Sequence, residues 1–423
     1  MKKKIICVLL SAVLCLGAMS GCAAQNRSEK AAASGDPKVV TVDVPQTEST
    51  GTSQGVSQPT ASPLGLTDFD SQLIAFLLEH GYAGENFAVS PLSFRAALAL
   101  AASGAEGQTL NQLLAVMGFS SVEEMNAWYE TVLAGVDRFD ESTHSAFFGE
   151  SDSAYRLVNS VWSNADLPGE FRPAYVQAVR ERLRAEAASV PANELTGAVN
   201  DWVNEQTNGL IPRLLNDASG SAAVLVNALY LKAGWLEQFH GVGTDRFTTA
   251  AGETVDKDYM EVTERYSYYE DEGCQMVSVP LEGGVSMVFA LGDAANIAQK
   301  LSAAERTKVH VTVPKFDLST SLDNSEFKEF LLALGCDRIF EDDAEFDPMF
   351  TDSLFVDDIV QKAKIKIYEE GLEAAAATGM IMKNGVSLHE EEPKEFRADR
   401  AFSFYLIQEG DAPELLFFGQ IVK

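Results

Sequence analysis

Hydrophobic residues recur at helical spacing through most of the first half of the chain. The segment 67–80 shows this pattern clearly, because its apolar positions share one side of a helix that Thr67 or Asp68 can cap and Gly81 can end. The same spacing predicts helices over the Ala/Leu-rich run after Pro91 and over 108–117, 122–137, 172–187, 194–206 and 324–335.

Alternating or continuous apolar runs dominate after residue 220. The segment 357–370 alternates cleanly, with three lysines on one face and Ala363, Ile365 and Ile367 on the other. Helices that come first and strands that come later predict an α+β fold. Further strands are predicted over 223–235, 275–281, 285–291, 308–316, 402–408 and 414–422.

The N-terminal residues carry an export signature. Lysines at positions 2 to 4 precede an apolar run over 5–18, which is too short for a comfortable membrane span. Small residues directly before Cys22 match the pattern of bacterial lipoprotein processing, so we expect residues 1–21 to be removed and Cys22 to carry lipid. An ordinary signal peptide with a chance cysteine is the alternative. Residues 22–65 have the composition of a flexible tether, which leaves 66–423 as one folded domain.

The charge balance argues against several classes of partner. The chain carries 32 basic and 62 acidic residues, and removal of residues 1–21 takes away three lysines and no acid, for a net charge of −33. Such a chain is repelled by phosphate backbones and anionic lipid headgroups. We therefore expect no nucleic-acid partner, and membrane contact through the lipid anchor alone.

Cysteine usage gives no reason to expect a metal. Once the signal peptide and Cys22 are set aside, Cys274 and Cys336 remain; two free thiols are favoured and a disulfide between them stays open. The sequence has no CxxC motif and no Cys/His cluster, so neither zinc nor another cofactor is expected.

No enzyme motif is convincing. The sequence lacks GxSxG, HExxH and GxxxxGK[ST]. Ser325 and Lys328 form an SxxK motif, but the SDN and KTG motifs that accompany it in penicillin-binding proteins are missing. The five histidines are scattered. We therefore expect a protein that is not an enzyme.

The stretch YEEGLEAAAATG, residues 368–379, can form a strand without being committed to one. From Leu372 onward every second residue is apolar or small, whereas Glu373 and Lys383 fall on the opposite face. Alanine and glycine are weak strand formers, and a surface loop with a helical turn is the alternative. Two acids and Gly371 suit a chain reversal that would lay this stretch antiparallel beside its parent strand.

Several segments, in the correct order, resemble the motifs of the serpin family. Residues 368–378 resemble the serpin reactive-loop hinge E-E-G-T-E-A-A-A-A-T, and residues 86–109 resemble the stretch around the Ser-Pro-x-Ser shutter. Together the motifs span nearly all of 66–423. The others are N-x-W-V-x-x-x-T-x-G-x-I at 199–215, V-N-A-x-Y-F-K-x-x-W at 224–239, VPKF at 313–316 and the two closing strands.

The resemblance implies a serpin fold, in which N-terminal helices surround a large central mixed sheet with further sheets beside it. It also implies an exposed reactive loop, about 369–395, that a target protease cuts to form an acyl-enzyme. The cut loop then enters the central sheet as a new strand and distorts the protease. The implied shutter residues are Ser90, Ser93, Asn227 and Gln361. The implied hinge residues are Glu369, Glu370, Gly371, Leu372, Glu373, Ala374, Ala375, Ala376, Ala377 and Thr378.

Two hinge and shutter positions depart from the family pattern. Leu372 stands where inhibitory serpins usually carry Thr, Ser or Val, so its bulk is expected to slow the start of insertion. Gln361 stands where many animal serpins have a histidine, and its amide can still hydrogen-bond across strands. The small residues that follow Glu373 form an intact hinge, which favours inhibition.

The reactive bond follows from counting along the loop. Taking Gly371 as the first residue, the usual position gives a bond between Gly385 and Val386, with Lys383 and Met382 as alternatives that suit trypsin-like and elastase-like proteases.

From the N-terminal signature and the family resemblance together, we expect a monomeric, lipid-anchored protein on the outer face of a bacterial cell membrane. It is expected to trap extracellular serine proteases, or cysteine proteases. A non-inhibitory protein of the same fold, cleaved as a substrate or acting as a binder, is the alternative.

Overall fold

The computed structural model describes residues 66–143, 153–293, 296–322, 324–356, 358–372 and 392–423. The signal segment, the tether and Cys22 lie outside them. No helix within the described ranges is long and apolar enough to cross a membrane.

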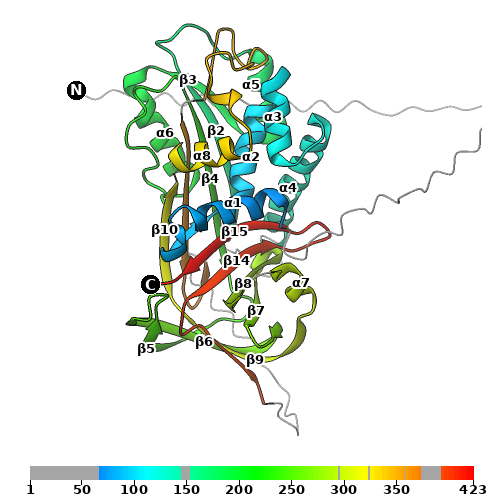
Figure 1. The fold of residues 1–423 in the computed structure, drawn as a ribbon, viewed down its shortest axis with the longest axis vertical. Helices are drawn as coiled ribbons and strands as arrows, with labels where there is room; N and C mark the ends of the chain where they lie inside the picture. Colours follow the sequence, from blue (N-terminus) through cyan, green and yellow to red (C-terminus); the bar gives the residue numbers. More distant parts are fainter. Residues whose placement is uncertain (1–65, 144–152, 294–295, 323, 357, 373–391) are drawn as a thin grey trace, which may run out of the picture. The chain divides into compact units, whose positions relative to one another are not determined.

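The first half of the described chain is rich in helices (Figure 1). Thr67 and Asp70 form a capping box at the start of α1, and Ser90 caps α2 directly before Pro91. The longer helices are α1 (Asp68–Glu79), α2 (Pro91–Ala102), α3 (Gly107–Met117), α4 (Val122–Thr143), α5 (Pro173–Leu183) and α6 (Ala192–Gln206), with α7 (Ile297–Ser302) and α8 (Asn324–Ala333) later in the chain.

A six-stranded sheet forms the centre of the domain, with strand order β10-β11-β12-β4-β2-β3. The long neighbours β4 and β11 run parallel, while the two-residue strand β12 is antiparallel to both. The bounds are β2 (Ala154–Asn164), β3 (Glu186–Val190), β4 (Ala223–Gly234), β10 (Phe316–Leu322), β11 (Asp358–Ile367) and β12 (Gly371–Leu372).

A second sheet of nine strands has the order β1-β15-β14-β8-β7-β6-β9-β13, with β5 paired to β6. Its strands are β1 (Phe87–Val89), β5 (His240–Thr248), β6 (Thr254–Glu270), β7 (Cys274–Leu281), β8 (Val285–Gly292), β9 (Glu305–Pro314), β13 (Lys394–Arg397), β14 (Phe402–Gln408) and β15 (Glu414–Ile421).

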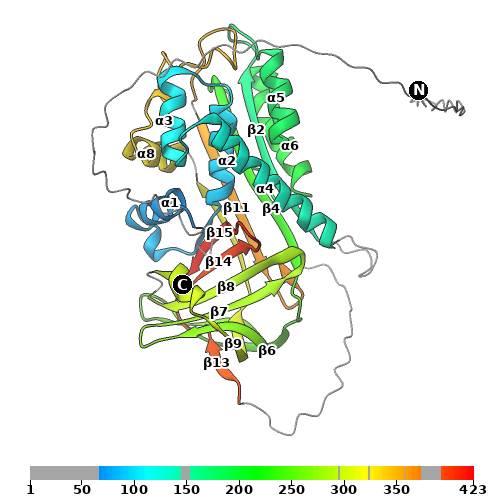
Figure 2. The ribbon, with the colours of Figure 1, turned by 90° about the vertical axis from the view of Figure 1, so that its right-hand side faces the viewer.

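The two faces of β4 pack in different places because successive side chains of a strand point to opposite sides. Val226 and Tyr230 join a cluster with α6, whereas Leu229 and Leu231 join a cluster with the second sheet. Figure 2 shows α2 and α6 on opposite sides of β2 and β4. The middle of β4 is therefore packed on both faces.

Helices and strands are more interleaved than the sequence pattern indicated. β2 and β3 lie between helices, and the sequence pattern did not predict β2, β3, β5 or β6. β5 is exposed along most of its length, so it lacks the apolar face from which a strand is usually predicted. The α+β class and the large mixed sheet agree with the prediction.

Candidate functional site

The chain reverses direction at the end of β11 and re-enters the central sheet. Tyr368 and Gly371 exchange backbone hydrogen bonds of 3.0 and 3.3 Å, which close the turn. Leu372 then pairs with Ile367 of β11 on one side and with Ala233 of β4 on the other. Gly371 and Leu372, the first residue of the predicted strand, thus lie between β4 and β11.

Gly371 is required by this close approach. Its φ is +151°, and a Cβ added there would lie 2.2 Å from the Ala233 carbonyl oxygen and 2.7 Å from the Gly234 Cα. Both contacts are with backbone, which cannot rotate away as a side chain can. Only glycine lets the chain pass between the two strands at this point.

Trp235, the residue after β4, fixes the turn from one side. Its backbone N–H donates to the Glu370 carbonyl at 3.0 Å, and its indole Nε1 donates to the Tyr368 carbonyl at 2.8 Å. Two carbonyls of the turn are satisfied by one residue, so the indole of Trp235 reports directly on whether the turn is in place.

Glu369 fixes the turn from the other side. Its carboxylate lies 3.0 Å from Lys315 Nζ, and its carbonyl accepts a hydrogen bond from the Phe239 N–H. Burial raises the pKa of Glu369, but the hydrogen bond from Lys315, a backbone hydrogen bond and the charge of Lys315 together outweigh burial, so the pKa lies below its ordinary value. Both side chains of the pair are about a quarter exposed.

Leu372 is seated in the core. Its side chain is 3% exposed and belongs to the same hydrophobic cluster as Ala233, Ile365 and Ile367. The bulky residue that the sequence identified as a departure thus already occupies a buried position, and the sheet accommodates it without a charged neighbour on that face.

From their paired segments toward Leu372, the strands β4 and β11 diverge. They pair directly only over Val224–Asn227 and Asp358–Gln361. At the other end β12 separates them, and a strand between two others sets them about 9.5 Å apart. Across this opening, no pairing joins 228–232 to 362–366 among the described residues. The central sheet is therefore closed at one end and wide enough for another strand at the other.

The predicted shutter residues meet where β4 and β11 pair. Ser93 Oγ donates to Asn227 Oδ1 at 2.7 Å, and Gln361 Nε2 donates to the same oxygen at 2.8 Å. Gln361 also exchanges hydrogen bonds with the backbone of Ser90, with lengths of 3.1 and 2.9 Å. All four residues are buried, and Gln361 forms the hydrogen bond across strands that is predicted from the sequence.

Two further residues extend this network and were not found from the sequence. Asn227 Nδ2 donates to Asn159 Oδ1 at 3.0 Å, Asn159 Nδ2 donates to the Tyr129 hydroxyl, and that hydroxyl donates to the Leu183 carbonyl. Burial raises the pKa of Tyr129 far above its ordinary value, so its hydroxyl stays protonated. Asn159 carried no clear sequence signal, because β2 contains several other polar residues, among them Arg156 and Ser160.

Several predicted site residues lie outside the described ranges. These are Cys22, the hinge residues from Glu373 to Thr378, and the candidate reactive-bond residues Met382, Lys383, Gly385 and Val386. Their roles remain predictions.

The two candidate disulfide cysteines are free and buried. Burial raises the pKa of the Cys336 thiol to about 12 and also raises that of Cys274, so both stay protonated at neutral pH. Within the described ranges, no group of three or more His, Cys, Asp or Glu residues could hold a metal ion.

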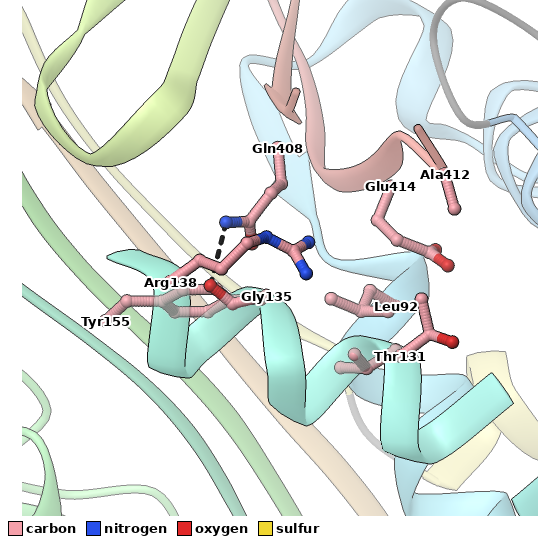
Figure 3. Close-up of a pocket in the computed structure, with 9 residues that line it drawn as sticks. Leu92, Thr131, Gly135, Arg138, Tyr155, Gln408, Ala412 and Glu414 are labelled. Atoms are coloured by element: carbon pink, nitrogen blue, oxygen red, sulfur yellow. Dashed lines mark hydrogen bonds between the residues drawn. The ribbon is translucent and has the colours of Figure 1, made fainter. Parts of the chain in front are cut away.

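A small pocket lies between α4 and the β14–β15 hairpin (Figure 3). Gln408 crosses it and donates a hydrogen bond of 2.9 Å to the Gly135 carbonyl. Arg138 and Glu414 are its charged lining residues. The lining contains no paired nucleophile and base, so the pocket offers no arrangement for covalent catalysis.

Comparisons with known proteins agree with this geometry. A family model described as Serpin (serine protease inhibitor) matches residues 65–423. Leukocyte elastase inhibitor from Bos taurus is 30% identical over 389 residues, covering 84% of this chain and 97% of that protein. Serpin-Z1A from Triticum aestivum is 31% identical over 377 residues, covering 81% and 90%.

Solved structures show the same architecture. Serpin48 from the insect Tenebrio molitor has a TM-score of 0.72 at 26% sequence identity, covering 87% of this chain and 100% of that one. A native, stressed conformation of AtSerpin1 from Arabidopsis has a TM-score of 0.69 at 25% identity. With the family match over the whole folded domain, these similarities show that the chain belongs to the serpin family of serine protease inhibitors.

Proposed function

We propose that this protein inhibits extracellular serine proteases as a suicide substrate, with cysteine proteases as a second target class. The observation that carries the proposal is the position of Leu372 between β4 and β11, above an opening one strand wide. The cleaved loop would continue from Leu372 into that opening as a new central strand.

The register supports this proposal. Leu372 is level with Ala233 and Ile367, so an antiparallel continuation places Thr378 level with Asn227 and Gln361. Those two residues are already partners in the parallel pairing of β4 with β11. A single continuous strand therefore satisfies the registers at both ends of the opening, without a bulge.

The inner face of the opening matches the loop residue by residue. Ala374 would face Leu231 and Ile365, and Ala376 would face Leu229 and Ala363, all four of which are buried and apolar. The next inward residue, Thr378, would reach the buried polar pair Asn227 and Gln361. Separating that pair breaks the hydrogen bond between them, and the Thr378 hydroxyl can both donate and accept in its place.

Formation of the acyl-enzyme requires only the catalytic residues of the protease. Its serine hydroxyl attacks the carbonyl of the reactive bond, an ester forms, the peptide C–N bond breaks and the new amine leaves with a proton. Water would normally hydrolyse that ester. Insertion along β4 carries the attached protease on the order of 35 Å, about eleven residues of strand. Distortion on arrival prevents hydrolysis, so the ester persists.

The test is to mix soluble protein lacking residues 1–22 with elastase, trypsin, chymotrypsin and subtilisin and to analyse the products on denaturing gels. We expect an SDS-resistant adduct of the combined mass, and mass spectrometry of the released C-terminal fragment identifies the reactive bond. Clean cleavage without an adduct would reject inhibition and favour the substrate alternative. A gain of trapping in Leu372→Thr would then assign the failure to Leu372.

We further propose that the mature protein is anchored outside the cell by lipid on Cys22. The lysine-rich start, the short apolar run and the small residues before Cys22 support this location. Metabolic labelling with a radioactive fatty acid should mark the wild type and leave Cys22→Ser unlabelled. Equal labelling of both proteins would contradict the anchor.

A further inference from the structure

The outer face of the opening carries an unusual concentration of positive charge for so acidic a protein. β11 presents Lys362, Lys364 and Lys366 on this face, and β4 presents Lys232, all partly exposed. The chain as a whole carries almost twice as many acidic as basic residues. Lysines along one opening make the local potential favourable for an acidic side chain.

The register determines which lysines face each other. Leu372 occupies the row of Ala233 and Ile367, so the next row down contains Lys232 and Lys366, one on each side of the opening. Their side chains point outward, opposite to the buried Leu372. A residue inserted in that row would have one lysine on either flank.

Lys366 already takes part in one ion pair across the sheet. Asp317 of β10 is its register partner, and Asp317 Oδ2 lies 3.4 Å from Lys366 Nζ. Across the sheet, this row therefore contains the negative Asp317 on β10, the positive Lys366 on β11, the open position, and the positive Lys232 on β4. An acidic side chain in the open position would complete an alternating row of four charges across four strands, and opposite charges on neighbouring strands attract.

We propose that Lys232 and Lys366 form a receptor for the Glu373 carboxylate, which guides the first step of loop insertion. The inference rests on the proposed function. Glu373 directly follows Leu372 in the sequence, so a strand that continues from Leu372 in the same register would bring Glu373 into this row, on the outward side. The attraction between the Glu373 carboxylate and the two lysines would favour the start of insertion, when few contacts on the inner face have formed.

Lys364 provides a matched control. It lies two residues from Lys366 on the same face of the same strand, and its register partner on β10 is Ser319. Continuing the loop places an alanine, Ala375, in its row. A charge change at Lys364 alters the surface charge as much as one at Lys366 without touching the proposed receptor.

The experiment measures the partition between trapping and hydrolysis for the full-length chain. The moles of inhibitor consumed beyond one per mole of protease give the ratio of hydrolysis to insertion. We expect Glu373→Lys, and the double variant Lys232→Glu with Lys366→Glu, each to raise that ratio about tenfold. Combining all three changes should return it to within about threefold of the wild type, and Lys364→Glu should leave it unchanged.

Two outcomes would overturn the receptor. One is a triple variant whose ratio of hydrolysis to insertion is as high as that of the single and double variants. The other is a Lys364→Glu ratio as high as that of the double variant, which would show that overall surface charge, and not the receptor, controls insertion.

A second measurement does not depend on trapping, namely the rise in thermal midpoint after the loop is cut. If the cut wild type shows a rise without forming adducts, inhibition fails while the receptor is still tested by the same variants. If it shows no rise, the loop does not insert and both proposals fall.

Discussion

At the scale of single residues, Gly371 decides whether the hinge can lie in the sheet. A Cβ there would collide with the backbone of Ala233 and Gly234. Gly371→Ala is therefore expected to expel Leu372 and to cost more than about 1 kcal/mol of folded-state stability. The change should appear in the Trp235 fluorescence, because the indole donates to the Tyr368 carbonyl of the same turn.

Gly197 offers the control for that substitution. It lies within α6, has an ordinary helical φ and has no atom within 4 Å of an added Cβ. Gly197→Ala should be neutral or slightly stabilising. An unchanged Trp235 signal in Gly371→Ala would contradict the argument from close approach.

The pair Lys315 and Glu369 is expected to contribute modestly. Because the folded pKa of Glu369 lies below its unfolded value, its stabilisation is present above the unfolded pKa and is lost as pH falls through the folded pKa. Partial exposure limits the coupling, so a double-mutant cycle with Lys315→Ala and Glu369→Gln should give about 0.5–1 kcal/mol at pH 7. A coupling indistinguishable from zero would show that the turn is held by its backbone hydrogen bonds alone.

At the scale of elements, the shutter joins α2, β2, β4 and β11 through one buried side chain. Asn227→Ala would leave Ser93, Asn159 and Gln361 with unsatisfied groups, at an expected cost of about 3 kcal/mol. Asn216→Ala, at an exposed position, is the control and should change stability by less than about 0.5 kcal/mol. Equal thermal midpoints for the two variants would contradict the network.

A buried charge cluster joins α1, α2, α4 and β15 elsewhere in the domain. The Arg95 guanidinium lies 4.4 Å from the Phe119 ring centroid and 4.5 Å from that of Trp128, whose Nε1 donates to Glu414. Burial raises the pKa of Asp70 to about 6 and that of Glu414 to about 7, although Arg95 opposes both shifts.

The pH dependence of stability should follow from those raised values. A carboxyl whose pKa is higher in the folded than in the unfolded state binds its proton more tightly when folded, so stability falls as pH rises between about 4 and 7. Glu414→Gln keeps an acceptor for Trp128 and should lessen the loss between pH 5 and pH 8 by about 2 kcal/mol. Glu79→Gln, at the exposed end of α1, is the control, and its stability should depend on pH as that of the wild type does. If the stability of Glu414→Gln depended on pH in the same way as that of the wild type, Glu414 would not be the source of the loss.

Prediction from sequence worked where a local pattern controls structure. The alternation of β11 and the glycine of the turn both lie within a few residues, so the reversal and the buried face of Leu372 were predictable. The hydrogen bond between Asn159 and Tyr129, which extends the shutter, was not predictable. These residues lie about 30 apart in the sequence, on β2 and α4, so no local pattern links them. The exposed strand β5 was missed because solvent on both faces removes the apolar signal.

At the scale of the whole molecule, acidity should decide how the protein responds to polyanions. A net charge of −30 opposes binding of a sulfated polysaccharide such as heparin. Heparin should therefore leave the rate of protease inhibition unchanged within about twofold at physiological salt. An acceleration of tenfold or more would reveal a basic site that outweighs the overall charge.

In the proposed mechanism the cut loop becomes a strand between β4 and β11. Hydrogen–deuterium exchange before and after loop cleavage measures whether it does. We expect the amides within 228–232 and 362–366 that face the opening to exchange much more slowly after cleavage, while the β7–β8 hairpin, Cys274–Gly292, stays unchanged. Unaltered exchange along both edges of the opening would show that the loop does not insert, and the proposed mechanism would be wrong.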